Sequence, residues 1–161
     1  MRIRSSVERE PAAGRFWRNL VLGLWVGGFV VGGLSHLADI VVFGWLPYTH
    51  VPAVLNAFFT ALLPLGFLVA ALLLVRPRAG LLLGLAVLTG DILANAWVIA
   101  QPEIGGWHWR YALILLFALF VVLTLPRLLR AAADDQAISK TPSTSTAAPS
   151  GSTGQETADR A

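Results

Sequence analysis

The sequence predicts an all-α protein: a polytopic membrane bundle of four helices that run up and down, with both termini in the cytoplasm. Its 161 residues are 56% hydrophobic and only 13% charged, whereas soluble domains carry about a quarter charged residues. Long apolar runs separated by short polar segments are typical of several spanning helices. The chain has no cysteine, which excludes thiol catalysis, disulfide exchange and iron–sulfur ligation.

Four apolar stretches have the length that a bilayer-spanning helix requires. Pro64 lies within the second stretch, where it predicts a mild kink. Pro126 is expected to end the fourth, because proline removes a backbone donor and crowds the preceding turn. The predicted spans cover about residues 16–42, 53–75, 79–99 and 109–126.

The segments that flank the spans are polar. Residues 1–15 are mixed in charge and are expected to form a flexible N-terminus at the cytoplasmic surface. Residues 131–161 are rich in Ser, Thr, Ala, Pro and Gly, so they cannot bury enough apolar surface to fold and predict a disordered cytoplasmic tail. The transmembrane domain between these segments covers residues 16–130.

Basic residues set the predicted orientation. They precede the first span, occupy the turn between the second and third, and follow the fourth, whereas Arg110 is the only one near the other two loops. The positive-inside rule therefore predicts that both termini are cytoplasmic. Eleven of the twelve basic residues are arginine, a composition that we interpret as bacterial. We therefore expect the protein in the bacterial inner membrane. Because the arginines flank apolar segments, the net charge of +3 is a topology signal and not a nucleic-acid surface.

Polar side chains on three spans predict a cluster in the outer half of the bilayer. Asp91 lies about 18 Å above the cytoplasmic side of a core of about 30 Å. An ionised carboxylate there costs at least about 2.5 kcal/mol unless it faces protein or water. Asn95 shares its helix face at i+4. The inner half of the bilayer is left to Leu, Val, Ala and Gly, and the predicted cluster consists of His36, Asp39, Asn56, Thr60, Asp91 and Asn95.

Four functions are compatible with such a cluster. The first is a small-ligand or proton- and ion-handling site, with Asp91 as proton carrier and His36 as the group that titrates near neutrality. The second is a structural role, in which Asp91 pairs with Asn95, His36 or a backbone group, and Asn56 and Thr60 join helices. In that case the protein is an accessory or structural subunit of a larger membrane complex.

The other two functions involve a metal. His36, Asp39 and Asp91, with His50 or His108, have the residue types that suit a hard or borderline divalent ion, although no HxxxH or HExxH spacing occurs. His36 and His108 could also be the axial ligands of a b-type haem. No catalytic motif points to an enzyme, and no cofactor is expected. The expected partners are the lipid bilayer and either another membrane protein or a second copy of the chain.

Small residues recur four positions apart on the first and third spans. Gly28 and Gly32 form one such pair, and Gly80 and Gly84 form another. This spacing lets helix backbones approach closely. We therefore expect the first and third helices to pack against each other below the polar cluster. Gly23 and Gly27 repeat the pattern on the first span.

Two segments resemble small four-helix membrane proteins of bacteria. They are SHLADIVVFGWLPY at residues 35–48 and GDILANAW at residues 90–97. The resemblance spans about residues 36–97, and it implies no particular activity.

Overall fold

The computed structural model describes residues 12–103 and 109–140, and helices are the only regular elements in that part of the chain. All four are long and apolar enough to cross a membrane, which confirms the predicted all-helical class with four helices of spanning length. Their bounds are Ala12–Phe43 for α1, Ala53–Val75 for α2, Pro77–Ile99 for α3 and Trp109–Lys140 for α4.

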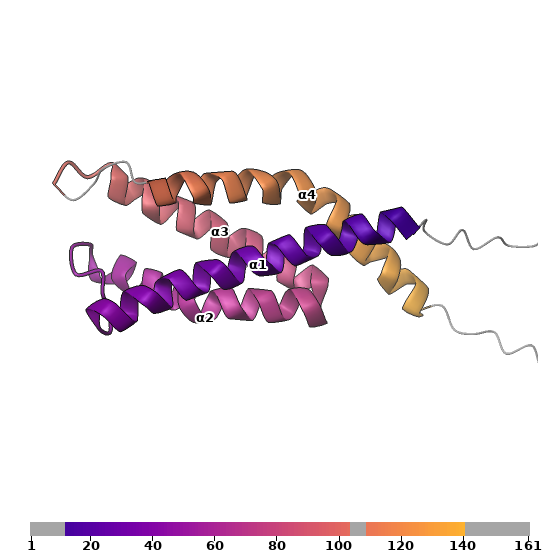
Figure 1. The fold of residues 1–161 in the computed structure, drawn as a ribbon, viewed down its shortest axis with the longest axis horizontal. Coiled ribbons are helices and arrows are strands. Elements are labelled where there is room, and N and C mark those ends of the chain that lie inside the picture. The colour runs from indigo at the N-terminus through magenta and orange to yellow at the C-terminus, as the bar shows by residue number, and fades with distance from the viewer. Residues whose placement is uncertain (1–11, 104–108, 141–161) are drawn as a thin grey trace, which may run out of the picture.

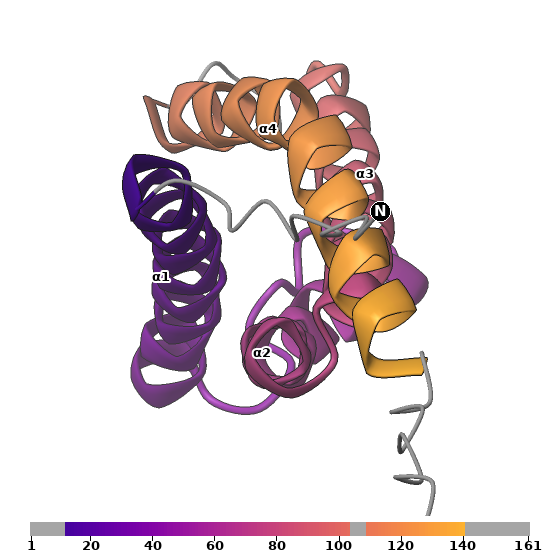
Figure 2. The ribbon, with the colours of Figure 1, turned by 90° about the vertical axis from the view of Figure 1, so that its right-hand side faces the viewer.

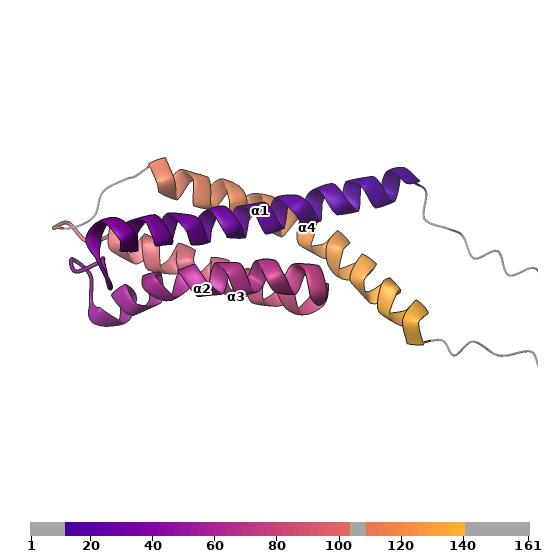
Figure 3. The same cartoon turned by 60° about the horizontal axis from the view of Figure 1, so that its bottom comes forward.

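Helices that follow one another in the chain lie side by side. Contacts are most extensive between α1 and α2, then between α2 and α3, and between α3 and α4, while α1 and α4 touch less than these neighbouring pairs do. In the end-on view of Figure 2 the four helices follow one another around the molecule in chain order. The start of α1, the α2–α3 turn and the end of α4 point to the same end (Figures 1 and 3). The α1–α2 loop therefore lies at the opposite end from the turn.

The turn between α2 and α3 consists of a single residue, Arg76. Its N–H donates to the carbonyl of Leu72 at 2.7 Å, and its own carbonyl accepts from the N–H of Gly80 at 3.1 Å. The first turn of α3 thus rests directly on the last turn of α2. A Cβ at Gly80 would lie 2.8 Å from the carbonyl carbon of Leu72, so only glycine allows this tight reversal.

The main hydrophobic core joins all four helices at the end that carries the α2–α3 turn. The indole of Trp25 is fully buried, and its Nε1–H donates to Oγ1 of Thr124 at 2.9 Å. That bond links α1 to α4 and satisfies the one polar atom of a buried tryptophan. The buried members of this core are Trp25, Phe29, Val69, Leu73, Leu81, Leu88, Val121 and Leu128.

A smaller apolar cluster lies near the α1–α2 loop. Its buried members are Val51 in the loop, Phe59 and Leu62 on α2, and Ala94 on α3. Tyr48 packs against this cluster from the loop, with its ring 5.2 Å from that of Phe59 between centroids. The cluster is therefore the support on which the polar residues of this end are arranged.

The structure corrects the predicted end of the fourth helix. α4 continues through Pro126 to Lys140, so the expectation that Pro126 ends it is wrong, and residues 131–140 of the predicted tail belong to this helix. Proline removes one hydrogen bond and bends a helix without forcing it to stop. Figure 1 shows the bend in α4, and beyond the proline Leu128 is buried in the main core.

At the N-terminal end, residues 12–15 of the segment predicted to be flexible lie in the first turn of α1. The remainder of that predicted segment, residues 1–11, and the remainder of the predicted tail, residues 141–161, lie outside the described residues.

The glycines predicted to pack the first helix on the third have other neighbours. A Cβ at Gly28 would collide with the ring of Phe117 on α4, and Gly80 rests on α2. A Cβ at Gly32 would meet no heavy atom within 4 Å. Of the four, only Gly84 faces α1, where a Cβ would lie 3.0 Å from the ring of Phe29. The prediction of direct backbone packing between α1 and α3 is therefore wrong, because Gly28 faces α4, Gly80 rests on α2, and the ring of Phe29 lies between Gly84 and the α1 backbone.

The close helix approach occurs between α1 and α2 instead. A Cβ at Gly66 would lie 2.8 Å from the carbonyl oxygen of Phe29 and 3.3 Å from the Cα of Gly33. Gly33 and Gly66 are both buried. This glycine-to-glycine crossing accounts for the extensive contact between α1 and α2.

Candidate functional site

The α1–α2 loop has a defined conformation that depends on Asn56. α1 ends at Phe43, and Gly44 follows with φ +86°, as is usual after a helix C-terminus. Leu46 also has a positive φ of 59°, which is strained for a residue with a Cβ. The buried amide of Asn56 donates to the carbonyl of Leu46 at 3.0 Å and accepts from the N–H of Tyr48 at 3.1 Å. Asn56 therefore holds the loop against α2.

This loop conformation places the hydroxyl of Tyr48 between two side chains of α1. The hydroxyl donates to Oδ2 of Asp39 at 2.8 Å, and its oxygen lies 2.7 Å from Nδ1 of His36. His36 and Asp39 are three residues apart and share a helix face. The rings of His36 and Tyr48 meet edge to face, with 6.1 Å between centroids. Tyr48 thus connects two of the predicted site residues, which do not bond to each other directly.

The donor count fixes the histidine tautomer. A tyrosine hydroxyl has one proton, and here it is donated to Asp39. The 2.7 Å contact with His36 therefore requires Nδ1–H as the donor, which leaves Nε2 with its lone pair while the ring is neutral. The result is a directed chain from His36 through Tyr48 to Asp39.

Arg110, at the start of α4, completes this group. Its Nη1 lies 3.8 Å from Oδ1 of Asp39, at the outer limit of an ion pair, with the side chains 54% and 19% exposed. Burial is the main cause that raises the pKa of the Tyr48 phenol, followed by its hydrogen bond to Asp39 and by the negative charge there, while Arg110 acts in the opposite direction. The phenol therefore stays neutral well into the alkaline range.

Asp91 and Asn95 on α3 bond to each other. The Nδ2 of Asn95 donates to Oδ1 of Asp91 at 2.8 Å and to its backbone carbonyl at 2.9 Å. Both side chains are half-buried. The negative charge of Asp91 also contributes to the raised pKa of Tyr48, as the smallest cause. Asp91 is thus within electrostatic range of the tyrosine, while its hydrogen bonds in the described part of the chain stay within α3.

Thr60 is buried, and its hydroxyl donates to the carbonyl of Asn56 at 2.8 Å within α2. This local bond satisfies the hydroxyl inside an apolar helix. Among the described residues, the hydrogen bond of the Thr60 hydroxyl stays within α2 and does not join two helices.

The six predicted residues therefore form three arrangements. His36 and Asp39 meet at the Tyr48 hydroxyl, Asn56 fixes the loop backbone with Thr60 bonded behind it, and Asp91 pairs with Asn95. Sequence reasoning missed Tyr48 and Arg110 as members of the site, because Tyr48 lies outside the spans and Arg110 was considered only for the orientation. The signal that could have found Tyr48 is its place in a short loop directly after two ionisable residues of one helix face.

The metal and haem alternatives gain no support from the described residues. In residues 12–103 and 109–140, no three His, Asp or Glu side chains come together in a way that could hold a metal ion. His50 is exposed in the loop. His108, the other proposed haem ligand, lies outside the described residues.

Comparison of the chain with protein-family models, with curated proteins and with solved structures gave no match. The function of this site therefore has to be argued from its own geometry.

Proposed function

We propose that the chain is a multi-pass protein of the bacterial inner membrane, with both termini in the cytoplasm and a proton-handling site at its non-cytoplasmic end. The arginines support the orientation. Arg15 and Arg18 lie near the start of α1, Arg76 forms the α2–α3 turn, Arg78 lies in the first turn of α3, and Arg127 and Arg130 lie in the last part of α4. These parts of the helices lie toward one end of the molecule (Figure 1). The positive-inside rule assigns that end to the cytoplasm.

The observation that carries the proton-handling role is the chain from His36 through Tyr48 to Asp39. A proton that arrives at Nε2 of His36 allows the Nδ1 proton to move to the oxygen of Tyr48. The hydroxyl proton of Tyr48 then moves to Oδ2 of Asp39, and a neutral carboxylic acid results. Both hydrogen bonds are 2.8 Å or shorter, which is the geometry that proton transfer requires. No bond other than those to the protons is made or broken.

The opposite half of the helices supports exchange on one side only. The core at the arginine-rich end is built from apolar side chains, including the fully buried Trp25 and Leu73. The indole N–H of Trp25 donates to the Thr124 hydroxyl, and that hydroxyl donates to the backbone carbonyl of Phe120. We therefore propose a site that exchanges protons with the non-cytoplasmic side and does not conduct them across the membrane.

Nitrogen NMR of the histidine-labelled protein in nanodiscs tests the relay. The expected result is that His36, assigned by loss of its signal in His36→Gln, carries its proton on Nδ1 when neutral. Tyr48→Phe removes the partner of Nδ1, so the variant should show a mixture of tautomers. A wild-type His36 with its proton on Nε2 would contradict the relay.

Proteoliposomes with an internal pH dye separate one-sided exchange from transport. We expect the wild type and Asp91→Asn to conduct protons equally slowly. A flux that the wild type supports and Asp91→Asn abolishes would contradict the one-sided site and make Asp91 the carrier of a transported proton.

The orientation has its own test, which uses the absence of native cysteine. Thr49 in the α1–α2 loop and Ala79 at the start of α3 are both exposed. A membrane-impermeant thiol reagent should label Thr49→Cys in intact spheroplasts, and Ala79→Cys only after the membrane is opened. The reverse pattern would overturn the proposed orientation.

A partner subunit is the second candidate, and one observation favours it. Gly23 and Gly27 lie on the exposed side of α1, and a Cβ at either would meet nothing within 4 Å. Such a bare small-residue ridge permits close packing of another helix. Oxidative cross-linking of Gly23→Cys in membranes tests this, because it should trap a dimer or a complex that Val41→Cys, on an exposed position farther along α1, does not.

A further inference from the structure

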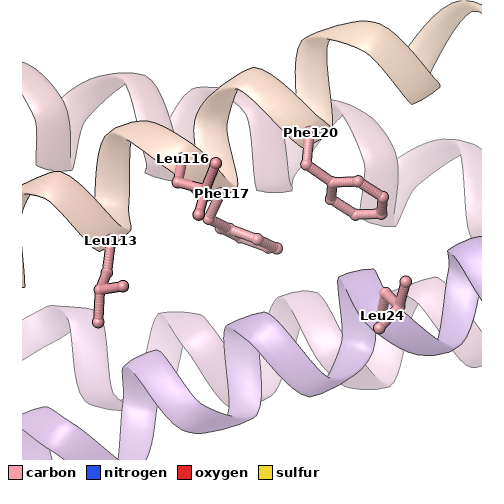
Figure 4. Close-up of a pocket in the computed structure, with 5 residues that line it drawn as sticks. All are labelled: Leu24, Leu113, Leu116, Phe117 and Phe120. Atoms are coloured by element: carbon pink, nitrogen blue, oxygen red, sulfur yellow. The ribbon is translucent and has the colours of Figure 1, made fainter.

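An apolar groove separates α1 from the first half of α4. Its lining consists of Leu24 on α1 and Leu113, Leu116, Phe117 and Phe120 on α4, and its volume is about 260 Å³. Figure 4 shows the α4 side chains directed toward α1, with Leu24 opposite. The volume is a little below the roughly 300 Å³ at which small-molecule pockets begin. The groove is open along its side, so it suits a narrow chain better than a compact molecule.

Both ends of the groove are defined by contacts between the two helices. At the arginine-rich end Trp25 bonds to Thr124, and the ring of Phe117 lies over Gly28. At the loop end Asp39 faces Arg110. The α4 residues of this seam follow a spacing of three and four, which places them on one helix face. They are Arg110, Leu113, Phe117, Phe120 and Thr124.

The stretch of α4 from Arg110 to the inner end of the groove at Phe120 matches one leaflet of a bilayer in length. From Arg110 to Phe120, α4 rises about 15 Å at 1.5 Å per residue, and half of a hydrocarbon core of about 30 Å is the same length. An acyl chain that entered at the interface beside Arg110 would therefore end near Phe120. The main core beyond that point closes the way.

One turn before Leu113 on α4, Arg110 faces Asp39 on α1, so one charge of each sign lies beyond the loop end of the groove. The guanidinium of Arg110 is 54% exposed and lies 3.8 Å from Oδ1 of Asp39, so the two groups form no close ion pair, while Oδ2 of Asp39 accepts from Tyr48. Guanidinium binds phosphate through parallel N–H bonds. A carboxylate accepts hydrogen bonds from an ammonium. A headgroup with a phosphate and a primary ammonium complements both.

We propose that the groove between α1 and α4 binds a zwitterionic phospholipid of the non-cytoplasmic leaflet, with one acyl chain along Leu113, Phe117 and Phe120. Its phosphate is held by Arg110 and its primary ammonium by Asp39. The site shares Asp39 with the proton relay. The NMR experiment measures the tautomer of His36 and the lipid titration measures binding, so the two proposals fail separately.

Native mass spectrometry of the full chain in detergent tests this site, with titrations of phosphatidylethanolamine and of phosphatidylglycerol that carry identical acyl chains. We expect one phosphatidylethanolamine to bind about tenfold more tightly than phosphatidylglycerol, which lacks the ammonium. Arg110→Gln should weaken both lipids, because both have a phosphate. Asp39→Asn should remove the difference between them. Equal binding of the two lipids to the wild type would overturn the proposal.

A matched pair of variants tests the place of the acyl chain. Leu24→Trp puts a larger ring into the groove and should weaken phosphatidylethanolamine by about tenfold. Leu34→Trp makes the same change at an exposed position of α1 outside the groove and should bind like the wild type. If Leu24→Trp binds like Leu34→Trp, the groove does not hold the lipid. If the wild type forms a dimer when lipid is removed and Leu24→Trp stays monomeric, the groove binds a second copy of the chain. That result would also overturn the proposal.

Discussion

The hydroxyl of Tyr48 donates to the carboxylate of Asp39 at 2.8 Å, across the junction between a spanning helix and its loop. The bond has a charged acceptor at the edge of the apolar region, and such bonds contribute more than neutral ones. It also decides the state of two neighbours, because it makes the tyrosine oxygen an acceptor for His36 and leaves the second oxygen of Asp39 to Arg110. The polar group at this end therefore depends on one hydroxyl.

Tyr48→Phe should lower the free energy of unfolding by about 1.5–3 kcal/mol, the range for a hydrogen bond to a charged group. The ring remains and keeps its packing on Phe59, so the loss reports the hydroxyl alone. Unfolding in mixed micelles by graded addition of SDS measures it. Thr49→Val, which removes the neighbouring exposed hydroxyl, is the control and should be neutral. Equal stability of Tyr48→Phe and the wild type would show that the hydroxyl bonds nothing of consequence.

Alkaline titration should show one tyrosine that ionises late. The pKa of Tyr48 is raised by burial, by its bond to Asp39 and by nearby negative charge, above the ordinary tyrosine value of about 10. A raised pKa in the folded state means that the stability it represents is complete below about pH 10 and is lost as the pH rises further. The chain has two tyrosines, so phenolate absorbance can be followed in the wild type and in Tyr48→Phe. The late component should be absent from the variant, and its persistence would contradict the assignment.

The spanning helices could be predicted because their signal is local. Length and hydropathy are enough for a helix whose backbone must be satisfied within lipid, and all four occur where the sequence places them. The predicted helix end at Pro126 was wrong because the burial of Leu128 favours continuation of α4. The predicted packing of α1 on α3 was wrong because the spacing of glycines shows that a helix face carries small residues but does not show which helix covers that face.

The candidate site was less predictable because depth is only one coordinate. Counting residues along each span places His36, Asn56 and Asp91 at similar heights, but it does not give the rotation of each helix. Asp91 and Asn95 are four apart, so the nearest partner of each is the other. Tyr48 reaches its position only through a left-handed Leu46 and two bonds from Asn56. Such a loop conformation has no simple sequence signature.

Asn56→Ala should destabilise the protein by about 2 kcal/mol or more. It leaves the carbonyl of Leu46 and the N–H of Tyr48 without their partners, and each of these two part-buried hydrogen bonds contributes about 1 kcal/mol. The loop should then move, so backbone amide exchange at Tyr48 should rise more than exchange in the α2–α3 turn. Asn19→Ala, at an exposed position of α1, is the matched control. Unchanged exchange at Tyr48 in Asn56→Ala would show that the loop holds itself.

Asp91 and Asn95 should be coupled in a double-mutant cycle. Removing the amide by Asn95→Ala leaves a half-buried carboxylate without its donor, and we expect a cost of about 1–3 kcal/mol. In an Asp91→Ala background the same change should cost about 1 kcal/mol less, because no charge remains to be satisfied. SDS-induced unfolding of the four proteins gives the coupling energy. Additive losses would mean that the two side chains do not depend on each other, and a fully stable Asp91→Leu would remove the structural interpretation of the carboxylate.

Gly66→Ala and Gly27→Ala place the same methyl group in opposite surroundings. At Gly66 the new Cβ would lie 2.8 Å from the carbonyl oxygen of Phe29 and 3.3 Å from Gly33, so α1 and α2 must separate. Backbone atoms cannot rotate away as a side chain can, and overpacking of this kind costs about 1–3 kcal/mol. At Gly27 the methyl meets nothing within 4 Å, and the higher helix propensity of alanine should stabilise by up to about 1 kcal/mol. Unfolding of the two variants under identical conditions should therefore move in opposite directions from the wild type. A neutral Gly66→Ala would mean that α1 and α2 do not approach as closely as their crossing at Gly33 requires.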